Sequence, residues 1–572
     1  VVQYKNFDWH YIQTKHFDIY VSDSTGYHLN FLQKISEDAY DKIGNLLDWK
    51  IKDRVSIIIY SSHNDFQQTN VISSHLPEGV GGLTELLKNR VVIPFDGSYV
   101  EFKRVIYHEL VHAFLNDCVY GGSLKKMISN SIKVRIPLWM NEGLAEYAAN
   151  RWDTNSDMWI RDLAINAKTL PEIKNLNGYF AYRGGQSLWK FICEKWGEEV
   201  IAEIFYSIKV KKDINKGVKA ATGVDLKELT KQWHKYLKKE YWPDVATRDD
   251  IQDIARQITD HEELNNSYNI APSPSPDGTK IAIYSNRDGE MGIYILSAID
   301  GKFIKRIIRS NQTGKFEELH FLKPGISWSG DGENIVFSGK SDGEDALFIY
   351  NVNSKKENFS IIKVGLNGVF KPVWNPKNNK IAFIGNNGYS SDVYIYDLDT
   401  KLLINLTNDH FSDIQVAWHP KGELLLLVSD RGNNLYNTEL FDLNLLVDYD
   451  FNNLDIFTIN LNGEIERITD TPYNESYAMY SPDGTQIAYL SDESGISNIY
   501  IINVLLRSLN EDVQNSKPAT NVLTGISQIN WLSNNKLVFS GFYDSAYDIF
   551  ILSNIKRAVE EVKEVPLAKW RS

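Results

Sequence analysis

One short pattern recurs along the second half of the chain and constrains its fold more than any other feature. The tetrapeptide Ser-Pro-Asp-Gly at 275–278 precedes the apolar run 280–284, and the same tetrapeptide at 481–484 precedes the run 486–489. Related turns near 331, 377, 421 and 534 lead into similar runs, so that six turns follow one another at intervals of 44 to 62 residues. Short β-rich runs that recur with turn signals at such intervals predict a repeat architecture built from β-sheet units.

A second motif within the repeats has two interpretations. Residues 339–343 read Gly-Lys-Ser-Asp-Gly and match the G-x-S-x-G pattern around the nucleophile of serine hydrolases. That nucleophile must stand between a strand and a helix. Here the flanking runs 335–337 and 347–350 are both typical of strands, so we predict a hairpin turn without catalytic function.

The first half of the chain contains a motif of metal chemistry, His108-Glu109-x-x-His112, inside an apolar run without Gly or Pro. On a helix, residues four apart lie on one face, so His108 and His112 can present two nitrogens to one Zn²⁺. Glu109 stands beside them and can take a proton from a water that zinc activates. The alternative is a chance match on an amphipathic helix.

A third zinc ligand is expected downstream, because a catalytic zinc has three protein ligands and one open position. Glu142 is the candidate, in the run Asn-Glu-Gly-Leu-Ala-Glu at 141–146. Glu146 follows one helical turn later, and we expect it to hold the orientation of His108 through a hydrogen bond. The alternative makes Glu142 an acid at a helix N-terminus, favoured there by the helix dipole. Asn141 as the capping residue fits either interpretation.

These residues resemble the glutamate-ligand zinc peptidases, or gluzincins, and most of all the bacterial peptidase-MA-like group, over residues 1–240. The segments 9–20, 81–85, 89–94 and 181–187 resemble further parts of that group. The resemblance implies an α+β zincin-like domain with one catalytic Zn²⁺ held by His108, His112 and Glu142, and Glu109 as the base. The longer spacing between His112 and Glu142 than in the aminopeptidases implies an insertion around 120–135.

The resemblance also bears on two further parts of the active site. Gluzincins stabilise the oxyanion with a Tyr or His donor, for which Tyr182 is the first candidate and Tyr179 and His234 are the alternatives. In the aminopeptidases an acid on the strand beside the site binds the substrate's amino terminus. The acid here, Glu85, is displaced by one residue, which turns a strand side chain to the opposite face. We therefore expect an endopeptidase whose edge strand pairs with the substrate backbone.

The six repeats resemble the blades of a TolB-type β-propeller, which implies an all-β ring. The sixth unit supplies three strand-like runs, at 526–531, 536–542 and 547–552, whereas a blade has four strands. Residues 254–259 precede the first unit and resemble the outer strands at 403–407 and 465–469, each of which ends in Thr. We predict that residues 254–259 form the outer strand of the last blade and so close the ring.

Composition limits the class of partner. The chain of 572 residues has a formal charge of −13, which argues against nucleic acid and anionic membranes as main partners, and no run is long enough to span a membrane. Its two cysteines, Cys118 and Cys193, lie in apolar helical patterns and are expected to be buried thiols, with one disulfide as the alternative. The chain begins with Val1, so we expect an export signal to have been removed and the location to be extracytoplasmic, periplasmic or secreted.

The expected organisation is multidomain: a zinc peptidase domain at 1–243, a linker at 244–251 and a six-bladed β-propeller at 252–572. We expect a zinc metallopeptidase that hydrolyses peptide or protein substrates, with a propeller that recruits substrate or a protein partner, or controls access. The alternative is a non-catalytic binding or scaffold protein that acts through the propeller. The intact set of His108, Glu109, His112 and Glu142 favours the enzyme, since a scaffold has no need of a base.

Overall fold

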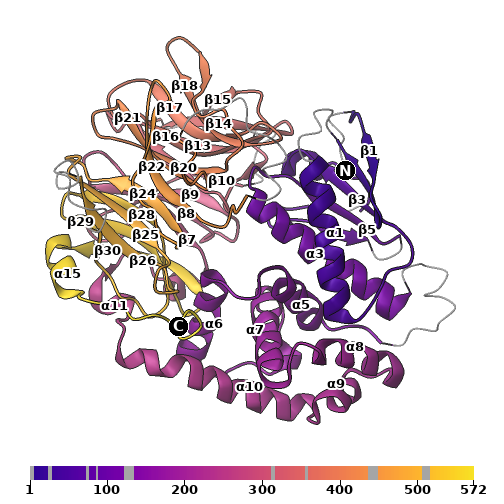
Figure 1. The fold of residues 1–572 in the computed structure, drawn as a ribbon. Helices are drawn as coiled ribbons and strands as arrows, with labels where there is room; N and C mark the ends of the chain where they lie inside the picture. The colour runs from indigo at the N-terminus through magenta and orange to yellow at the C-terminus, as the bar shows by residue number, and fades with distance from the viewer. Residues whose placement is uncertain are drawn as a thin grey trace. The chain divides into compact units, whose positions relative to one another are not determined.

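The computed structural model describes residues 6–22, 29–72, 76–85, 88–121, 134–310, 316–354, 359–435, 449–504 and 516–572. The chain divides into two compact units, and the division falls between Pro243 and Asp244 in the sequence (Figure 1). Most of the insertion expected at 120–135 lies outside the described residues. Among the described helices, none combines the length and the apolar character that a membrane span requires.

The first unit contains a five-stranded mixed sheet, in the order β1-β2-β3-β5-β4. The three central strands run parallel, and the two edge strands pair antiparallel with their neighbours. The strands are β1 (His10–Gln13), β2 (Phe17–Val21), β3 (Val55–Tyr60), β4 (Leu83–Glu85) and β5 (Arg90–Pro94). The segment 9–20, which resembles a part of the peptidase-MA-like group, forms two antiparallel strands. A tight turn separates them, in which Thr14 N donates to Phe17 O.

Helices make up the rest of the first unit. They are α1 (Leu29–Leu47), α2 (His63–Phe66), α3 (Tyr99–Tyr120), α5 (Leu138–Asn150), α6 (Thr154–Asn166), α7 (Tyr179–Trp196), α8 (Val200–Lys211), α9 (Ile214–Thr222) and α10 (Leu226–Tyr241). Helix α3 is well delimited, because the Ser98 side chain accepts from Glu101 N at its start and Gly121 adopts a left-handed conformation after its end. Both Cys118 and Cys193 are buried free thiols, as expected.

Helices α5 and α7 pack unusually closely, and two glycines make this contact possible. A Cβ atom on Gly143 would lie 2.4 Å from the Cα atom of Gly185, and one on Gly185 would lie 2.2 Å from the carbonyl oxygen of Trp139. No side chain fits between the helices at this point. The close approach brings Glu142 and Glu146 on α5 alongside the first turns of α7.

The second unit is a β-propeller with six sheets among the described residues. Blade one comprises β7 (Asn269–Pro274), β8 (Lys280–Ser285), β9 (Gly292–Ser297) and β10 (Phe303–Arg309). Blade two comprises β11 (Glu318–Leu319), β12 (Ile326–Trp328), β13 (Asn334–Ser341), β14 (Glu344–Asn351) and β15 (Phe359–Lys363). Blade three comprises β16 (Gly368–Trp374), β17 (Lys380–Asn386), β18 (Ser391–Asp397) and β19 (Leu403–Asn405). Blade four comprises β20 (Asp413–Trp418), β21 (Leu424–Ser429), β22 (Asp455–Asn460) and β23 (Ile465–Arg467). Blade five comprises β24 (Glu475–Tyr480), β25 (Gln486–Ser491), β26 (Asn498–Asn503) and β27 (Ser516–Pro518). The predicted all-β unit of six blades is confirmed.

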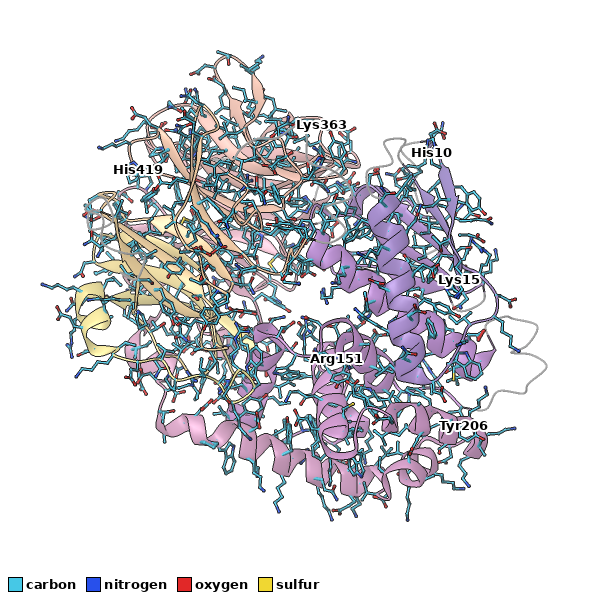
Figure 2. The ribbon with its side chains drawn as sticks, viewed as in Figure 1. His10, Lys15, Arg151, Tyr206, Lys363 and His419 are labelled. Atoms are coloured by element: carbon cyan, nitrogen blue, oxygen red, sulfur yellow. The ribbon has the colours of Figure 1, made fainter. Side chains whose placement is uncertain are left out.

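The recurring tetrapeptide forms the turn between the first and second strands of a blade. In the first copy, the Asp277 carboxylate accepts from the Ser275 hydroxyl and from Thr279 N. In the fourth copy His419, labelled in Figure 2, begins the turn, and its Nδ1 accepts from Lys421 N. Each turn thus satisfies its own backbone donors with a side chain, which explains why polar residues recur at these places.

The last blade comprises β28 (Ile526–Ser533), β29 (Lys536–Tyr543), β30 (Ala546–Ser553) and, from the start of the propeller, β6 (Arg256–Gln257). Strand β6 pairs antiparallel with β30, and Ile258 N donates to Ile549 O just beyond it. The predicted closure of the ring is therefore confirmed. The strand is shorter than the predicted 254–259, because Ile254 ends a short helix, α11 (Ile251–Ile254).

Two remaining expectations concern local structure in this unit. The G-x-S-x-G motif is a hairpin turn between β13 and β14, with positive φ at Asp342 and Gly343, as a tight turn between twisted strands requires. Beyond β30 the charged segment forms helix α15 (Ile555–Glu561). Within the segment expected as a linker, Arg248 is buried and donates to Asn521 Oδ1.

Candidate metal centre and active site

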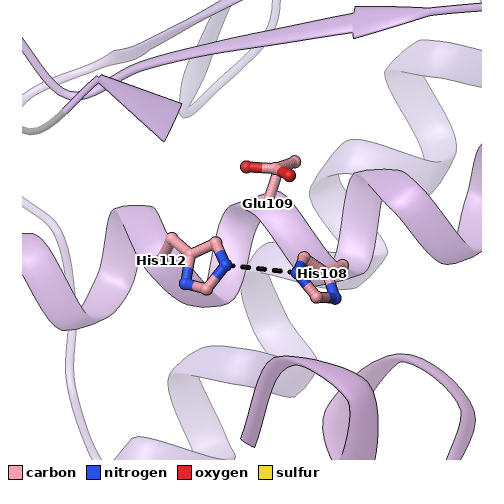
Figure 3. A group of neighbouring side chains, drawn as sticks. All are labelled: His108, Glu109 and His112. Atoms are coloured by element: carbon pink, nitrogen blue, oxygen red, sulfur yellow. Dashed lines mark hydrogen bonds between the residues drawn. The ribbon is translucent and has the colours of Figure 1, made fainter. Parts of the chain in front are cut away.

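Helix α3 presents the His-Glu-x-x-His motif in the geometry that its spacing predicts. The imidazoles of His108 and His112 lie along one face of the helix, with Glu109 on the adjacent side (Figure 3). Their Nε2 atoms are 3.2 Å apart. The ligand atoms of these three residues all lie within 4.8 Å of one another. The two imidazoles therefore converge on one point beside the helix.

Helix α5 brings Glu142 to the same point. Its Oε2 atom lies 3.3 Å from Nε2 of His108 and 3.2 Å from Nε2 of His112. The three atoms form a nearly equilateral triangle, and tetrahedral ligands at zinc's usual bond lengths of about 2.0–2.1 Å stand about 3.3 Å apart. The donor set of two imidazoles and one carboxylate thus fits a zinc ion.

The alternative explanation of Glu142 as an acid at a helix N-terminus is wrong. Helix α5 begins at Leu138 and its N-cap residue is Pro137, so Asn141 does not cap the helix. Glu142 lies in the second turn, where the helix dipole has little effect. Its side chain is only 12 % exposed and faces the two histidines.

The charges around this point favour a bound cation. Burial opposes a charged imidazole, yet hydrogen bonds with Glu142 and Glu146 raise the pKa of His108 to about 10. Burial likewise opposes the charged carboxyl of Glu142, but its hydrogen bonds with the two histidines hold its pKa far below the usual range. The two carboxylates thus stabilise positive charge at this point, whether on His108 or on a cation.

Glu146 holds the orientation of His108, as its position one turn after Glu142 suggested. Its Oε1 atom lies 3.1 Å from Nδ1 of His108. Its Oε2 atom accepts from Nη1 of Arg183 at 2.9 Å and from Nη1 of Arg104 at 3.4 Å. Burial opposes the charge, but these partners lower the pKa of Glu146 to about 2. The two arginines therefore keep this carboxylate ionised and fixed.

Strand β4 holds the carboxylate of Glu109. The Thr84 hydroxyl lies 2.7 Å from Oε2 of Glu109 and 2.9 Å from its backbone carbonyl oxygen. Just before the strand, a Cβ atom on Gly82 would lie 2.9 Å from Cγ and 3.0 Å from Oε1 of Glu109. The strand can pass this close only because residue 82 is glycine. Glu109 itself is 5 % exposed, and β4 fixes the direction of its carboxylate.

Of the three candidates for the oxyanion donor, Tyr182 alone reaches the metal ligands. Its ring stacks on that of His108, at 12° and 6.3 Å between centroids, and its hydroxyl is near enough to Glu142 for that carboxylate to affect its pKa. Burial, followed by the charges of Glu142 and Glu109, raises the pKa of Tyr182, which keeps the hydroxyl protonated. Tyr179 instead accepts from Arg183 Nε, and His234 Nε2 lies 2.9 Å from the carbonyl oxygen of Pro171.

Four residues that shape this site had no predicted role: Gly82, Thr84, Arg104 and Arg183. Arg183 follows the predicted Tyr182, and a buried carboxylate at Glu146 could have pointed to a cationic partner nearby. Thr84 and Gly82 carried no comparable signal, since their role depends on where β4 crosses α3. Glu85, which the strand period turns away from Thr84, pairs with Arg90 at 2.6 Å.

Comparisons with known proteins agree with both units. Residues 35–239 match the model of the Peptidase MA superfamily. The chain is 24 % identical over 191 residues to the Tol-Pal system protein TolB of Francisella tularensis subsp. tularensis (strain WY96-3418), a match over 33 % of this chain and 40 % of that protein. TolB of Vesicomyosocius okutanii is 30 % identical over 111 residues, 18 % of this chain and 26 % of that protein. The matches thus span less than half the length of these relatives.

Among solved structures, TolB from Acinetobacter baumannii aligns with 58 % of this chain and 71 % of its own, with a TM-score of 0.32 and 16 % identity. The family match covers helices α3, α5 and α7, which carry His108, His112, Glu142 and Tyr182. The chain therefore joins a Peptidase MA superfamily domain, over residues 35–239, to a six-bladed β-propeller with homologues among the TolB proteins.

Proposed function

We propose that this protein is a zinc-dependent endopeptidase. The observation that carries the proposal is the triangle of His108 Nε2, His112 Nε2 and Glu142 Oε2, with sides of 3.2 to 3.3 Å. A Zn²⁺ ion held there supplies a Lewis acid for the scissile carbonyl and makes water a stronger acid. The Peptidase MA superfamily match supports a peptidase, and the set of ligands supports zinc.

Glu109 is the proposed general base. Its carboxylate stands beside the ligand triangle, within 4.8 Å of the histidine ligand atoms, and the Thr84 hydroxyl holds one oxygen. The other oxygen is left to take a proton from the attacking water and to pass it to the leaving amine. A residue kept only for structure would need neither a carboxylate here nor a strand that fixes its direction. This arrangement favours the enzyme over a non-catalytic scaffold.

Tyr182 is the proposed donor to the oxyanion. Its hydroxyl reaches Glu142, a ligand of the proposed zinc, and burial keeps it protonated. A phenol in this state donates a hydrogen bond to a carbonyl oxygen as negative charge develops on it. The ring is held by stacking between His108 and Tyr179, so the hydroxyl has little freedom to move away.

Strand β4 is the proposed support for the substrate backbone. It is an edge strand of the five-stranded sheet, with β5 on one side, and among the described residues no strand pairs with its other side. An extended peptide can add to such an edge through main-chain hydrogen bonds. Glu85 is engaged by Arg90, so no acid of β4 remains to bind a free amino terminus beside the site. This favours cleavage within chains over removal of terminal residues.

We propose that the propeller recruits a protein substrate or partner, or controls access to the active site. We also propose that the protein is extracytoplasmic. The support is the likeness to proteins of the Tol-Pal system. Cell fractionation of the source organism with an antibody to this chain tests the location. A signal confined to the cytoplasmic fraction would contradict it.

Metal content tests the zinc centre directly. Native mass spectrometry of the full chain should find one zinc ion per molecule in the parent protein and in His234→Ala, whose histidine lies against Pro171. The variant His112→Ala should bind far less zinc, because two protein ligands remain. Equal zinc in His112→Ala and the parent would remove the proposal.

A further inference from the structure

The inner strands of the six blades place one residue each around a common cavity. Four of these strands end in an aromatic residue, and a fifth, β28, has Trp531 two residues before its end. The residue three positions before each of these aromatic residues lines the cavity. The tryptophans align neighbouring blades, because Trp328 Nε1 donates to Ser273 O and Trp418 Nε1 donates to Val373 O. We name this set the channel ring: Ala271, Gly325, Lys371, Gln415, Tyr477 and Gln528.

The backbone at most of these residues adopts an energetically unfavourable conformation. Ala271, Lys371, Tyr477 and Gln528 all have φ between 49° and 55°, a conformation that residues other than glycine rarely adopt. The register of each of these strands shifts at the same place, as in a β-bulge. Strain repeated at equivalent positions of four blades marks a site that the fold maintains, since an ordinary strand would avoid it.

Lys371 brings an unpaired positive charge into this cavity. Its Nζ atom lies over the ring of Tyr477, 5.1 Å from the centroid. None of the residues lining the cavity is acidic, and among the described residues no carboxylate pairs with Lys371, although the whole chain has an excess of acids. Burial and then the charge of Lys323 lower the pKa of Lys371 to about 8. The ammonium group therefore lacks a counter-ion that the protein itself could supply.

Gln415 is a second polar residue whose side chain has no hydrogen-bond partner among the described residues. Its side chain is 4 % exposed and lines the same cavity, and its amide makes no hydrogen bond within the described part of the chain. Gln528, by contrast, accepts from Ala271 N. Buried amides are nearly always hydrogen-bonded, so this amide, which lines the same cavity as Lys371, has a donor available for a ligand.

The available space limits the size of such a ligand. Ala271 and Gly325 contribute almost no side chain to the ring, and the cavity volume is about 60 Å³. This volume admits a carboxylate with the carbon atoms next to it.

We propose that the channel ring binds a carboxylate, to which the Lys371 ammonium group and the Gln415 amide nitrogen donate hydrogen bonds. Donors of this kind match the acceptor oxygens of a carboxylate in charge and in number. The carboxylate can belong to a free acid or to a peptide, as an acidic side chain or a chain end. The proposal concerns the propeller alone and does not depend on the zinc centre.

The test measures the acylation rate of Lys371 in the full chain by peptide mass spectrometry. The reagent is a succinimidyl ester, added with sodium acetate, with a peptide ending in a free aspartate, or with the same peptide amidated and its side chain esterified. Sodium chloride at equal ionic strength is the reference. At ten times Kd, bound carboxylate should slow acylation of Lys371 about tenfold, by mass action. Exposed Lys363, labelled in Figure 2, should react at an unchanged rate.

The two carboxylate probes separate the sources of the ligand. Protection by acetate and by the free-acid peptide at similar concentrations identifies a small-acid site, and protection by the peptide at much lower concentrations identifies a peptide site. Carboxylates should also raise the Tm of the parent and of Lys371→Arg, but not of Lys371→Met. The methionine variant should fold, because it replaces an unpaired, partly buried charge by an apolar chain. Equal protection by chloride, or an equal rise in Tm in Lys371→Met, would overturn the proposal.

Discussion

The Oε1 atom of Glu146 lies 3.1 Å from Nδ1 of His108, on the side of the imidazole away from Glu142. This contact fixes the ring so that Nε2 points to the proposed zinc. Arg183 and Arg104 fix the carboxylate in turn. The orientation of one metal ligand thus depends on a chain of charged groups that runs through α5 to α7 and α3.

Replacing Glu146 by Gln should weaken zinc binding by roughly 10- to 100-fold, the usual effect of losing such a partner of a ligand histidine. The amide of the introduced glutamine is uncharged, so its hydrogen bonds with Arg183 and with His108 are weaker than those of the carboxylate. Competition with a chelator of known affinity measures the change. The matched control is Glu101→Gln, which also loses a carboxylate that pairs with Arg104, at 2.8 Å, but lies half exposed. Unchanged affinity in Glu146→Gln would contradict the role.

Gly82→Ala should lower kcat while zinc content stays unchanged. The new Cβ atom would lie 2.9 Å from Cγ of Glu109, so the proposed base or strand β4 must shift. A displacement of the base by a few tenths of an ångström is expected to cost about tenfold or more in kcat. Gly79→Ala is the control, because no atom lies within 4 Å of its added Cβ. Equal loss of activity in both variants would point to a general effect on the segment.

Tyr182→Phe should lower kcat by roughly 10²–10³ with little change in KM, since the lost hydrogen bond forms only as the oxyanion develops. Steady-state kinetics on a fluorogenic peptide measure both constants. Tyr179→Phe removes the neighbouring hydroxyl, which accepts from Arg183, and should leave kcat nearly unchanged. A change confined to KM in Tyr182→Phe would indicate a binding role only.

Asp548→Ala should destabilise the propeller, because this carboxylate joins the two ends of the ring. It accepts from the Thr259 hydroxyl at 2.7 Å and from Asn269 Nδ2 at 3.0 Å, and it lies 2.6 Å from His261 Nδ1. Removing one partner of a buried charged pair costs about 3–5 kcal/mol. Urea unfolding followed by tryptophan fluorescence measures the loss. Asp300→Ala, at an exposed turn, should change stability by less than about 0.5 kcal/mol.

The parts that could be predicted are those carried by local patterns. The spacing of His108 and His112 determines their shared face on a helix, and the recurring turns determine the blades. Closure by residues 256–257 was predictable because a blade needs four strands and the sixth repeat has three. Tyr182 was proposed from a family resemblance, and its stacking on His108 is a finding of the structure.

The remainder depends on contacts between distant segments. Thr84 lies 25 residues before Glu109, and nothing in either local sequence indicates that β4 crosses α3 at that point. Asn141 has the character of a helix cap, but the helix begins earlier, at Leu138, so the local preference was misleading. The channel ring could not be predicted, because its bulges interrupt the alternation of apolar and polar residues by which strands are recognised.

Hydrolysis of peptides by the zinc-loaded full chain, compared with Glu109→Gln at equal zinc content, tests the central claim most directly. The variant keeps the three proposed ligands and differs by one group, so its zinc content should match that of the parent. Loss of the general base should lower kcat by about 10²–10⁴. Cleavage inside a peptide blocked at both ends by the parent, and its near absence in Glu109→Gln, is the predicted result. Equal turnover by the two proteins, or no turnover by the zinc-loaded parent on any of a broad set of peptides, would contradict the account.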